Sequence, residues 1–231
     1  MDFLSDGLVK AFQLLASGDA ELLGVLWLSL WVAGMATFLA MLVGVPFGVF
    51  LALHRFRGRS LFVTFVNAGM GLPPVVVGLV VFLLLARSGP LGRLGLLYTP
   101  TAMVIAQVII AVPMAVGVTL AGIQGLDDRL PLQLLSLGAT RFQLYLGLLR
   151  EARIALVAAL AAAFGSVISE VGAVMIVGGN IRGQTRVMTS ATVLETRQGE
   201  FARAIALAVV LLLIALAINA LFTWLQQRRP R

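Results

Sequence analysis

The chain has 231 residues, of which 60% are hydrophobic and 12% charged, whereas soluble domains carry about 25% charged residues. A mean hydropathy of +1.03 exceeds what one soluble core can bury, so much of the surface must face lipid. The net charge is +7, but the arginines stand between apolar runs, where they act as topology signals rather than as a nucleic-acid surface. Cysteine is absent and His54 is the only histidine, which excludes a thiolate or multi-histidine metal site and leaves little for an intramembrane enzyme.

A short helix is predicted before the first span, within residues 1–21. Leu4, Leu8, Phe12 and Leu15 fall on one helical face. This pattern is typical of a helix at the outer interface and equally of a lead-in helix packed on the bundle. The first residues carry no basic region, so no cleaved signal peptide is expected.

Five stretches within a transmembrane domain over 22–225 are long and apolar enough to cross the hydrocarbon core as helices. They cover residues 22–53, 61–86, 99–123, 154–177 and 201–225. A sixth candidate, Leu130–Leu149, contains Pro131, Gln133 and Arg141, and an arginine near mid-span costs about 2.5–3.5 kcal/mol. We therefore expect a loop over 127–153 with two short helices around Gly138. The predicted fold class is an all-α membrane protein with five spans.

The distribution of Lys and Arg predicts the orientation, because these residues favour the cytoplasmic side. If the loop after the first span is cytoplasmic, ten lie inside and seven outside. The inner residues are Arg55, Arg57, Arg59, Arg129, Arg141, Arg150, Arg153, Arg228, Arg229 and Arg231, and the outer ones are Lys10, Arg87, Arg93, Arg182, Arg186, Arg197 and Arg203. The N-terminus is then outside, and the 127–153 loop and the basic tail at 226–231 are cytoplasmic. No internal repeat is visible, so two-fold symmetry requires a second copy of the chain.

Pro73 and Pro74 lie in the middle of the second span. Each removes a backbone donor, and a broken helix at membrane depth survives only where it is buried in protein or lines a cavity. A helix restarting at Pro74 would present a partial positive end, which suits a passing anion. The alternative is a packing kink, an interpretation that fits Pro46 and Pro113 better.

The segment from Leu130 to Gln143 is amphipathic, mostly apolar and cytoplasmic, with a glycine where its two short helices meet. An exposed apolar patch on this side usually marks a surface for a partner protein. A helix lying on the lipid surface is the alternative.

Glu170 is the only acid within a predicted span, and intramembrane ionisable groups are functional candidates. We expect it to be protonated or paired with a donor such as Arg182 or Arg186, with a structural role at a gate or between helices favoured over direct substrate contact. Ser166 and Ser169 on the same helix either donate to an anion or satisfy carbonyls of their own helix. The outer arginines suit oxyanions and acidic docking surfaces alike.

Several motifs together resemble a known family. Leu137-Gly138-Ala139-Thr140-Arg141-Phe142 resembles the coupling loop of ABC importer permeases, which inserts into a cleft on the ATPase subunit, although Leu132-Gln133-Leu134 replaces the glutamate-alanine-alanine of that loop. The segments 71–79, 87–92 and 169–173 resemble permeases for molybdate, tungstate and sulfate. The segments 178–187 and 193–201 are most similar to the tungstate branch.

The resemblance spans about 22–225 and implies a type I ABC importer permease fold, working as a homodimer in a bacterial or archaeal cytoplasmic membrane. It implies two partners, an ATP-binding cassette ATPase dimer and an extracytoplasmic oxyanion-binding protein. The expected pathway or gate residues are Pro73, Pro74, Ser166, Ser169 and Glu170, and the expected docking or anion contacts are Asn180, Arg182 and Arg186.

ATP and Mg²⁺ are expected only in the partner ATPase. Lys10 is the only lysine and follows no glycine-rich loop, so a P-loop is excluded. The chain itself is therefore not expected to be an enzyme or to hold a cofactor. A self-contained ion-coupled carrier, or a permease for another oxyanion such as sulfate, is the alternative function.

Overall fold

The computed structural model describes residues 5–9, 12–13 and 18–227, and in this part of the chain every regular element is a helix. The helices are α2 (Ala20–Leu53), α3 (Arg59–Met70), α4 (Pro74–Leu85), α5 (Pro100–Gln124), α6 (Leu130–Ser136), α7 (Arg141–Glu151), α8 (Arg153–Ile168), α9 (Gly172–Gly178), α10 (Met188–Arg197) and α11 (Phe201–Gln227), with a 3-10 turn η1 (Gly92–Leu94). The predicted all-α fold class is confirmed. Much of the lead-in helix predicted within 1–21, and residues 228–231 of the predicted tail, lie outside the described residues.

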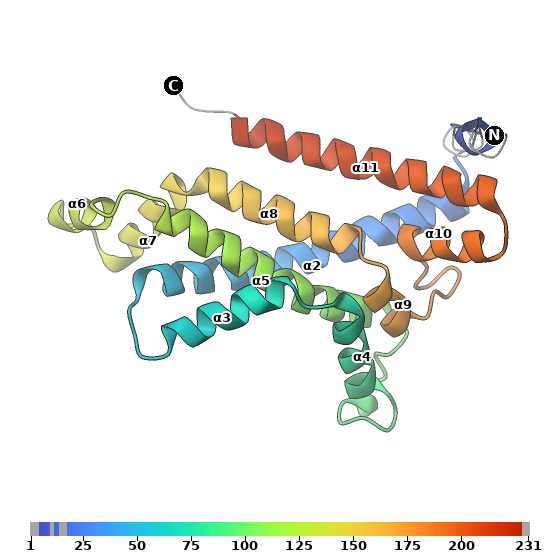
Figure 1. Ribbon diagram of the computed structural model, residues 1–231, viewed down its shortest axis with the longest axis horizontal. Coiled ribbons are helices and arrows are strands. Elements are labelled where there is room, and N and C mark those ends of the chain that lie inside the picture. Colours follow the sequence, from blue (N-terminus) through green and yellow to red (C-terminus); the bar gives the residue numbers. More distant parts are fainter. Residues whose placement is uncertain (1–4, 10–11, 14–17, 228–231) are drawn as a thin grey trace.

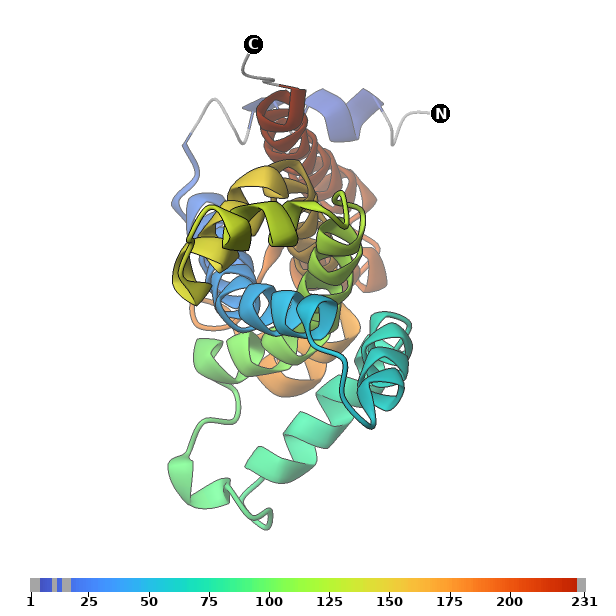
Figure 2. The same cartoon turned by 90° about the vertical axis from the view of Figure 1, so that its left-hand side faces the viewer.

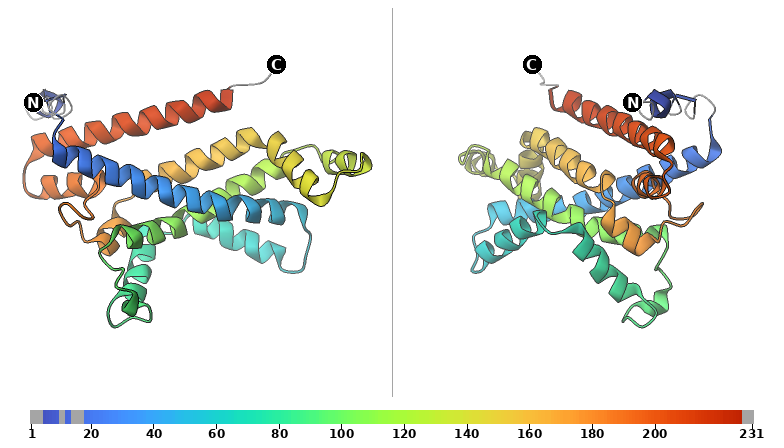
Figure 3. Two further views of the ribbon diagram at one scale, coloured as in Figure 1. Left: turned by 180° about the vertical axis from the view of Figure 1, so that it is seen from behind. Right: turned by 45° about the vertical axis from the view of Figure 1, so that its right-hand side comes forward.

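The long helices run along the long axis of the molecule (Figure 1). Helix α5 is central and packs against α2, α8, α3, α9 and α4, while α11 lies on α8. Helices α6 and α7 form one end, and α10 and the start of α2 form the other (Figures 1 and 3). Seen from the α6–α7 end, α4 projects away from the bundle (Figure 2).

Small residues bring α2 and α5 into close contact. A Cβ atom added at Gly44 would lie 2.5 Å from the Cβ of Ala115, and one added at Gly48 would lie 2.9 Å from the Cβ of Thr119. These distances are shorter than van der Waals contact, so only glycine permits this approach. Spacing of small residues by four positions is a general device for packing helices in lipid, where the hydrophobic effect does not drive helices together.

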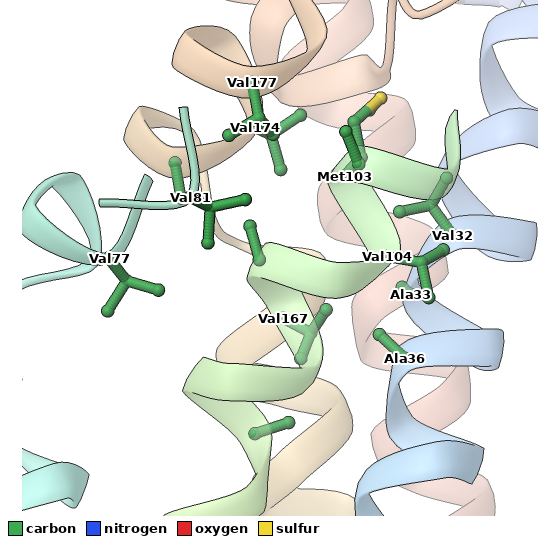
Figure 4. Packing of buried hydrophobic residues seen from close by; sticks show 14 of the residues in the cluster. Val32, Ala33, Ala36, Val77, Val81, Met103, Val104, Val167, Val174 and Val177 are labelled. Atoms are coloured by element: carbon green, nitrogen blue, oxygen red, sulfur yellow. The ribbon is translucent and has the colours of Figure 1, made fainter. Parts of the chain in front are cut away.

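The main apolar core lies where α2, α4, α5, α8 and α9 meet (Figure 4). Val32 of α2, Met103 of α5 and Val167 of α8 are each at most 1% exposed. By contrast, many large apolar side chains point outward, among them Trp27 at 70% and Leu212 at 68%. Such a surface requires hydrocarbon or another protein around it.

Within the described part of the chain, three helices are long and apolar enough to cross a membrane alone, namely α2, α5 and α11. They correspond to the spans predicted at 22–53, 99–123 and 201–225. Helices α3 and α4 meet at 101°, and α7 and α8 meet at 70°. If each bent pair counts as one span, the total is five.

The two remaining predicted spans are interrupted. The helix restarts at Pro74 as predicted, after a turn at 71–73. A continuous helix over 154–177 is wrong, because α8 ends at Ile168 and α9 begins at Gly172. No proline lies in this break. Thr189 of α10 donates to the Glu170 carbonyl within it, and Gln107 of α5 donates to Val167 O in the turn of α8 just before it.

Candidate functional site

The end formed by α6 and α7 is a helix–turn–helix around Gly138, as the sequence predicts. Gly138 has φ +81°, in the left-handed region that glycine adopts without strain. A reciprocal capping box then starts α7: the Thr140 hydroxyl accepts from Gln143 N at 3.3 Å, and Gln143 Oε1 accepts from Thr140 N at 2.8 Å. The turn is therefore specified locally and does not depend on a partner.

The same end carries an exposed apolar tip and a buried base. Leu137 is 84% exposed and Phe142 is 76% exposed. Leu144 and Leu148 of α7 are buried in a cluster with the ends of α2 and α5. The base fixes α7 to the bundle while the tip remains free to contact another protein. Ala139 is half-buried, and Arg141 is exposed beside Phe142.

The predicted pathway residues lie at two helix breaks that contact each other. At the first break, Val75 follows Pro74 in the opening turn of α4. A Cβ at Gly172, in the opening turn of α9, would lie 2.5 Å from Val75, and one at Gly78 would lie 2.6 Å from the Cα of Ala173. The starts of α4 and α9 are thus packed together, which brings Pro73 and Pro74 near the segment that contains Glu170.

Glu170 lies in the break between α8 and α9. Its Oε1 accepts a hydrogen bond from the backbone N–H of Ala173 at 3.0 Å, and its carbonyl accepts one from the Thr189 hydroxyl at 3.0 Å. The expected pairing of Glu170 with Arg182 or Arg186 is wrong, because both arginines lie beside Glu21 instead. The carboxylate therefore stabilises the first turn of α9, and its role at a gate stays a prediction.

Ser166 and Ser169 donate their hydroxyl hydrogens within their own helix. Ser166 Oγ donates to Ala163 O at 2.8 Å, and Ser169 Oγ donates to Gly165 O at 2.8 Å. The sequence left open whether these hydroxyls donate to an anion or to carbonyls of their own helix, and in this structure they donate to the carbonyls. An anion would have to displace these bonds before either hydroxyl could donate to it.

Glu21 gathers three arginines at the opposite end of the molecule. Arg182 Nε donates to Glu21 Oε1 at 2.8 Å, and a second bond joins the guanidinium to Oε2. Arg186 lies 3.6 Å and Arg203 3.8 Å from the same carboxylate. These bonds and the adjacent negative charge raise the pKa of Arg182 above its already high ordinary value. Arg203 also reaches Glu195 at 4.0 Å.

Asn180 stabilises the loop between α9 and α10 through hydrogen bonds to α10. Its φ is +52°, a conformation that Asn tolerates better than most residues. Its Oδ1 accepts from the Ser190 hydroxyl at 2.9 Å, and its Nδ2 donates to the Ser190 carbonyl. The loop is therefore anchored to α10 by Asn180 and to α2 by Arg182. Docking or anion contact by Asn180, Arg182 and Arg186 stays a prediction.

Two polar residues that organise these regions, Glu21 and Gln107, were not predicted from the sequence. Glu21 appears in the sequence only as an acid at the start of a span, and its partner Arg182 lies 161 positions away. Gln107 is a lone amide in an apolar run, yet it is buried and bonds Val167 O at 3.2 Å. A polar residue inside a span was the available signal for Gln107. Among the described residues, no group of three or more His, Cys, Asp or Glu is placed to hold a metal ion.

The comparisons with known proteins give one family. The family model "Binding-protein-dependent transport system inner membrane component" matches residues 44–230. The tungstate uptake system permease protein TupB of Peptoclostridium acidaminophilum is 40% identical, over 98% of this chain and 100% of the relative. A probable anion ABC transporter permease protein of Haloferax volcanii is 41% identical, over 93% and 96% of the two chains. TupB of Campylobacter jejuni is 36% identical, over 95% and 92%.

A solved structure is similar over nearly the whole chain. A bacterial ABC transporter involved in the import of the acidic polysaccharide alginate matches with a TM-score of 0.77 at 17% identity, covering 98% of this chain and 84% of that chain. This likeness supports the fold, and the family match and the three relatives support the ancestry. The chain belongs to the family of binding-protein-dependent transport system inner membrane components.

Proposed function

We propose that this chain is the membrane-spanning subunit of an ATP-driven importer for tungstate, and that it forms the translocation pathway. The observation that carries this proposal is the near full-length similarity, at 40% and 36% identity, to two permeases named for tungstate uptake. The polar groups near the membrane interior are compatible with an anion, because Glu170 is engaged with a backbone N–H.

The α6–α7 element is the proposed entry point for the energy of ATP. The sequence has no P-loop, so hydrolysis and its Mg²⁺ belong to a separate ATPase subunit. The exposed Leu137 and Phe142 offer the apolar contact that a cleft on that subunit requires. The buried Leu144 and Leu148 then connect any movement of the tip to the bundle.

Two copies of the chain are proposed to enclose the pathway. A single chain exposes apolar residues on α4 in the described structure, including Val75, Leu79 and Leu83, so this projecting helix has room for a protein neighbour as well as for lipid. With no internal repeat, a second copy is the simplest source of two-fold symmetry. The pathway would then pass near the contact between the starts of α4 and α9.

The opposite end is proposed to face the outside and to receive an oxyanion-binding protein. Arg182 has a side chain that is 71% exposed, and an acidic partner surface can approach it without first unfolding the loop. In the proposed orientation the N-terminus is outside and the C-terminus is in the cytoplasm. Binding of ATP would move the α6–α7 tips, switch the gate from one side to the other and release the anion inward.

Reconstitution tests the proposal. The permease, its ATPase and its binding protein would be placed in proteoliposomes, and ATP-dependent uptake of tungstate, molybdate and sulfate compared. Tungstate is expected to be taken up best. A preference for sulfate would contradict the proposed substrate, and uptake by the permease alone along an ion gradient would identify a self-contained carrier.

A further inference from the structure

A small pocket lined by both polar and apolar residues lies at the junction of α2, α5, α8 and α10. Its lining includes Ser29, Gln107, Val167, Glu170 and Met188. It offers about 10 Å³, close to the minimum that holds one water molecule. The pocket adjoins the break between α8 and α9, so whatever fills it contacts the segment that interrupts the fourth predicted span.

Gln107, which lines this pocket, carries an unpartnered acceptor. The residue is 4% exposed, and its Nε2 donates to Val167 O at 3.2 Å. Its Oε1 is buried and has no hydrogen-bond partner among the described residues. Buried polar atoms of this kind are normally satisfied by protein or by ordered water.

The hydroxyl groups around the pocket do not supply the missing donor. Ser29 Oγ donates to Val25 O at 2.6 Å, and it accepts from Met188 N at 2.8 Å. Thr189 Oγ1 donates to Glu170 O at 3.0 Å. With their hydrogens already committed, these groups leave an acceptor-rich pocket that requires a donor from outside the chain.

We propose that the pocket binds one water molecule, which donates one hydrogen bond to Gln107 Oε1 and the other to the Glu170 carboxylate. Water fits because the space is about one molecule in size and the two acceptors match its two hydrogens. The water joins α5 to the α8–α9 break and gives Glu170 a second contact besides Ala173 N. The proposal concerns a structural site and does not depend on which anion is transported.

X-ray radiolytic labelling of the full-length chain in its assembled, membrane-embedded complex tests this site. Radiolysis of a bound water produces a hydroxyl radical in place, which oxidises a methionine beside it. Met188 lines the pocket and is 1% exposed, whereas Met103 is 0% exposed, lies in the apolar core (Figure 4) and does not line the pocket. Met188 is expected to be labelled several-fold faster than Met103. Equal labelling rates at Met188 and Met103 would overturn the proposal. Absence of label at Met188 would overturn it too, because a dry pocket or a pocket holding a bare cation gives that result.

A pair of variants on α5 makes the test specific. Gln107→Leu removes the acceptor that holds the water, so the label at Met188 is expected to fall to the rate of Met103. Thr119→Val is the matched control, because Thr119 is also buried on α5 with an unpartnered hydroxyl but does not line this pocket. The control should leave the Met188 rate unchanged. Unchanged labelling of Met188 in Gln107→Leu would also refute the site. If that variant does not fold, the difference in labelling rate between Met188 and Met103 in the unsubstituted chain still decides the question.

Discussion

Replacement of Gly138 by tryptophan is the sharpest test of coupling at the α6–α7 tip. Gly138 has φ +81°, and a Cβ added there meets nothing within 4 Å. The Cβ of Trp therefore introduces no clash, and its backbone strain is about 1–2 kcal/mol, the cost of the left-handed conformation for an L-residue. That cost falls on a surface turn whose helices are capped by Thr140 and anchored by Leu148. Loss of coupling would then come from the bulk of the indole at the docking tip.

Gly199 provides the matched control for strain. It has φ +80°, and an added Cβ again meets nothing within 4 Å, but it lies between α10 and α11 at the opposite end of the molecule (Figure 1). Gly199→Trp therefore carries the same backbone cost and the same added surface. We expect it to retain the ATPase, while Gly138→Trp loses it.

Two measurements check this prediction. Co-purification of the ATPase with each variant reports association, and ATP hydrolysis stimulated by loaded binding protein in nanodiscs reports coupling. Gly138→Trp is expected to abolish the stimulation and to weaken association. Undiminished stimulated hydrolysis in Gly138→Trp, or equal loss of ATPase association in both variants, would refute the reasoning. Gly138→Asn should be mildest at this position, because Asn tolerates the left-handed region.

Three further substitutions test the packing, the turn and the outer cluster. Gly44→Val should lower stability by about 1–3 kcal/mol through overpacking against α5, measured as a lower Tm. Gly34→Val on the same helix should be neutral, since an added Cβ there meets nothing within 4 Å. Equal Tm values for the two variants would contradict the close contact between α2 and α5. Thr140→Ala should cost about 1 kcal/mol of local helix stability and speed hydrogen exchange in α7, while Thr140→Ser should not. Glu21→Gln should change Tm little, because the pair with Arg182 is exposed. It should alter the affinity of the chain for the binding protein, measured by surface plasmon resonance. An unchanged affinity would argue against docking at this loop.

Local chemistry in the sequence was enough to predict much of the architecture. Hydropathy identified α2, α5 and α11, since lipid requires long apolar helices. Pro74 marked the restart of a helix, and Gly138 marked the turn between α6 and α7. These features depend on a few adjacent residues, so they can be predicted from the sequence alone.

The remaining features depend on contacts between distant segments. The break at 169–171 contains no proline. Thr189 of α10 donates to the Glu170 carbonyl within it, and Gln107 of α5 donates to the carbonyl of Val167 in the last turn of α8. Likewise, the partner of Arg182 is Glu21, at the other end of the sequence. Charge alone offered Glu170 as a candidate partner, and only the topology distinguishes the two acids.

The 70° bend between α7 and α8 has a mechanical consequence. Ala152, between the two helices, is 4% exposed, and a pivot there would make the pair a two-armed lever. The arm on the docking side has 11 residues and the arm toward Ser169 has 16, or about 16 Å and 24 Å at 1.5 Å per residue. As a rigid body, the pair would magnify a displacement at the docking end by about half again at the far end. If the pair pivoted in this way, a push of a few ångströms on α7 would become a larger displacement beside the helix break.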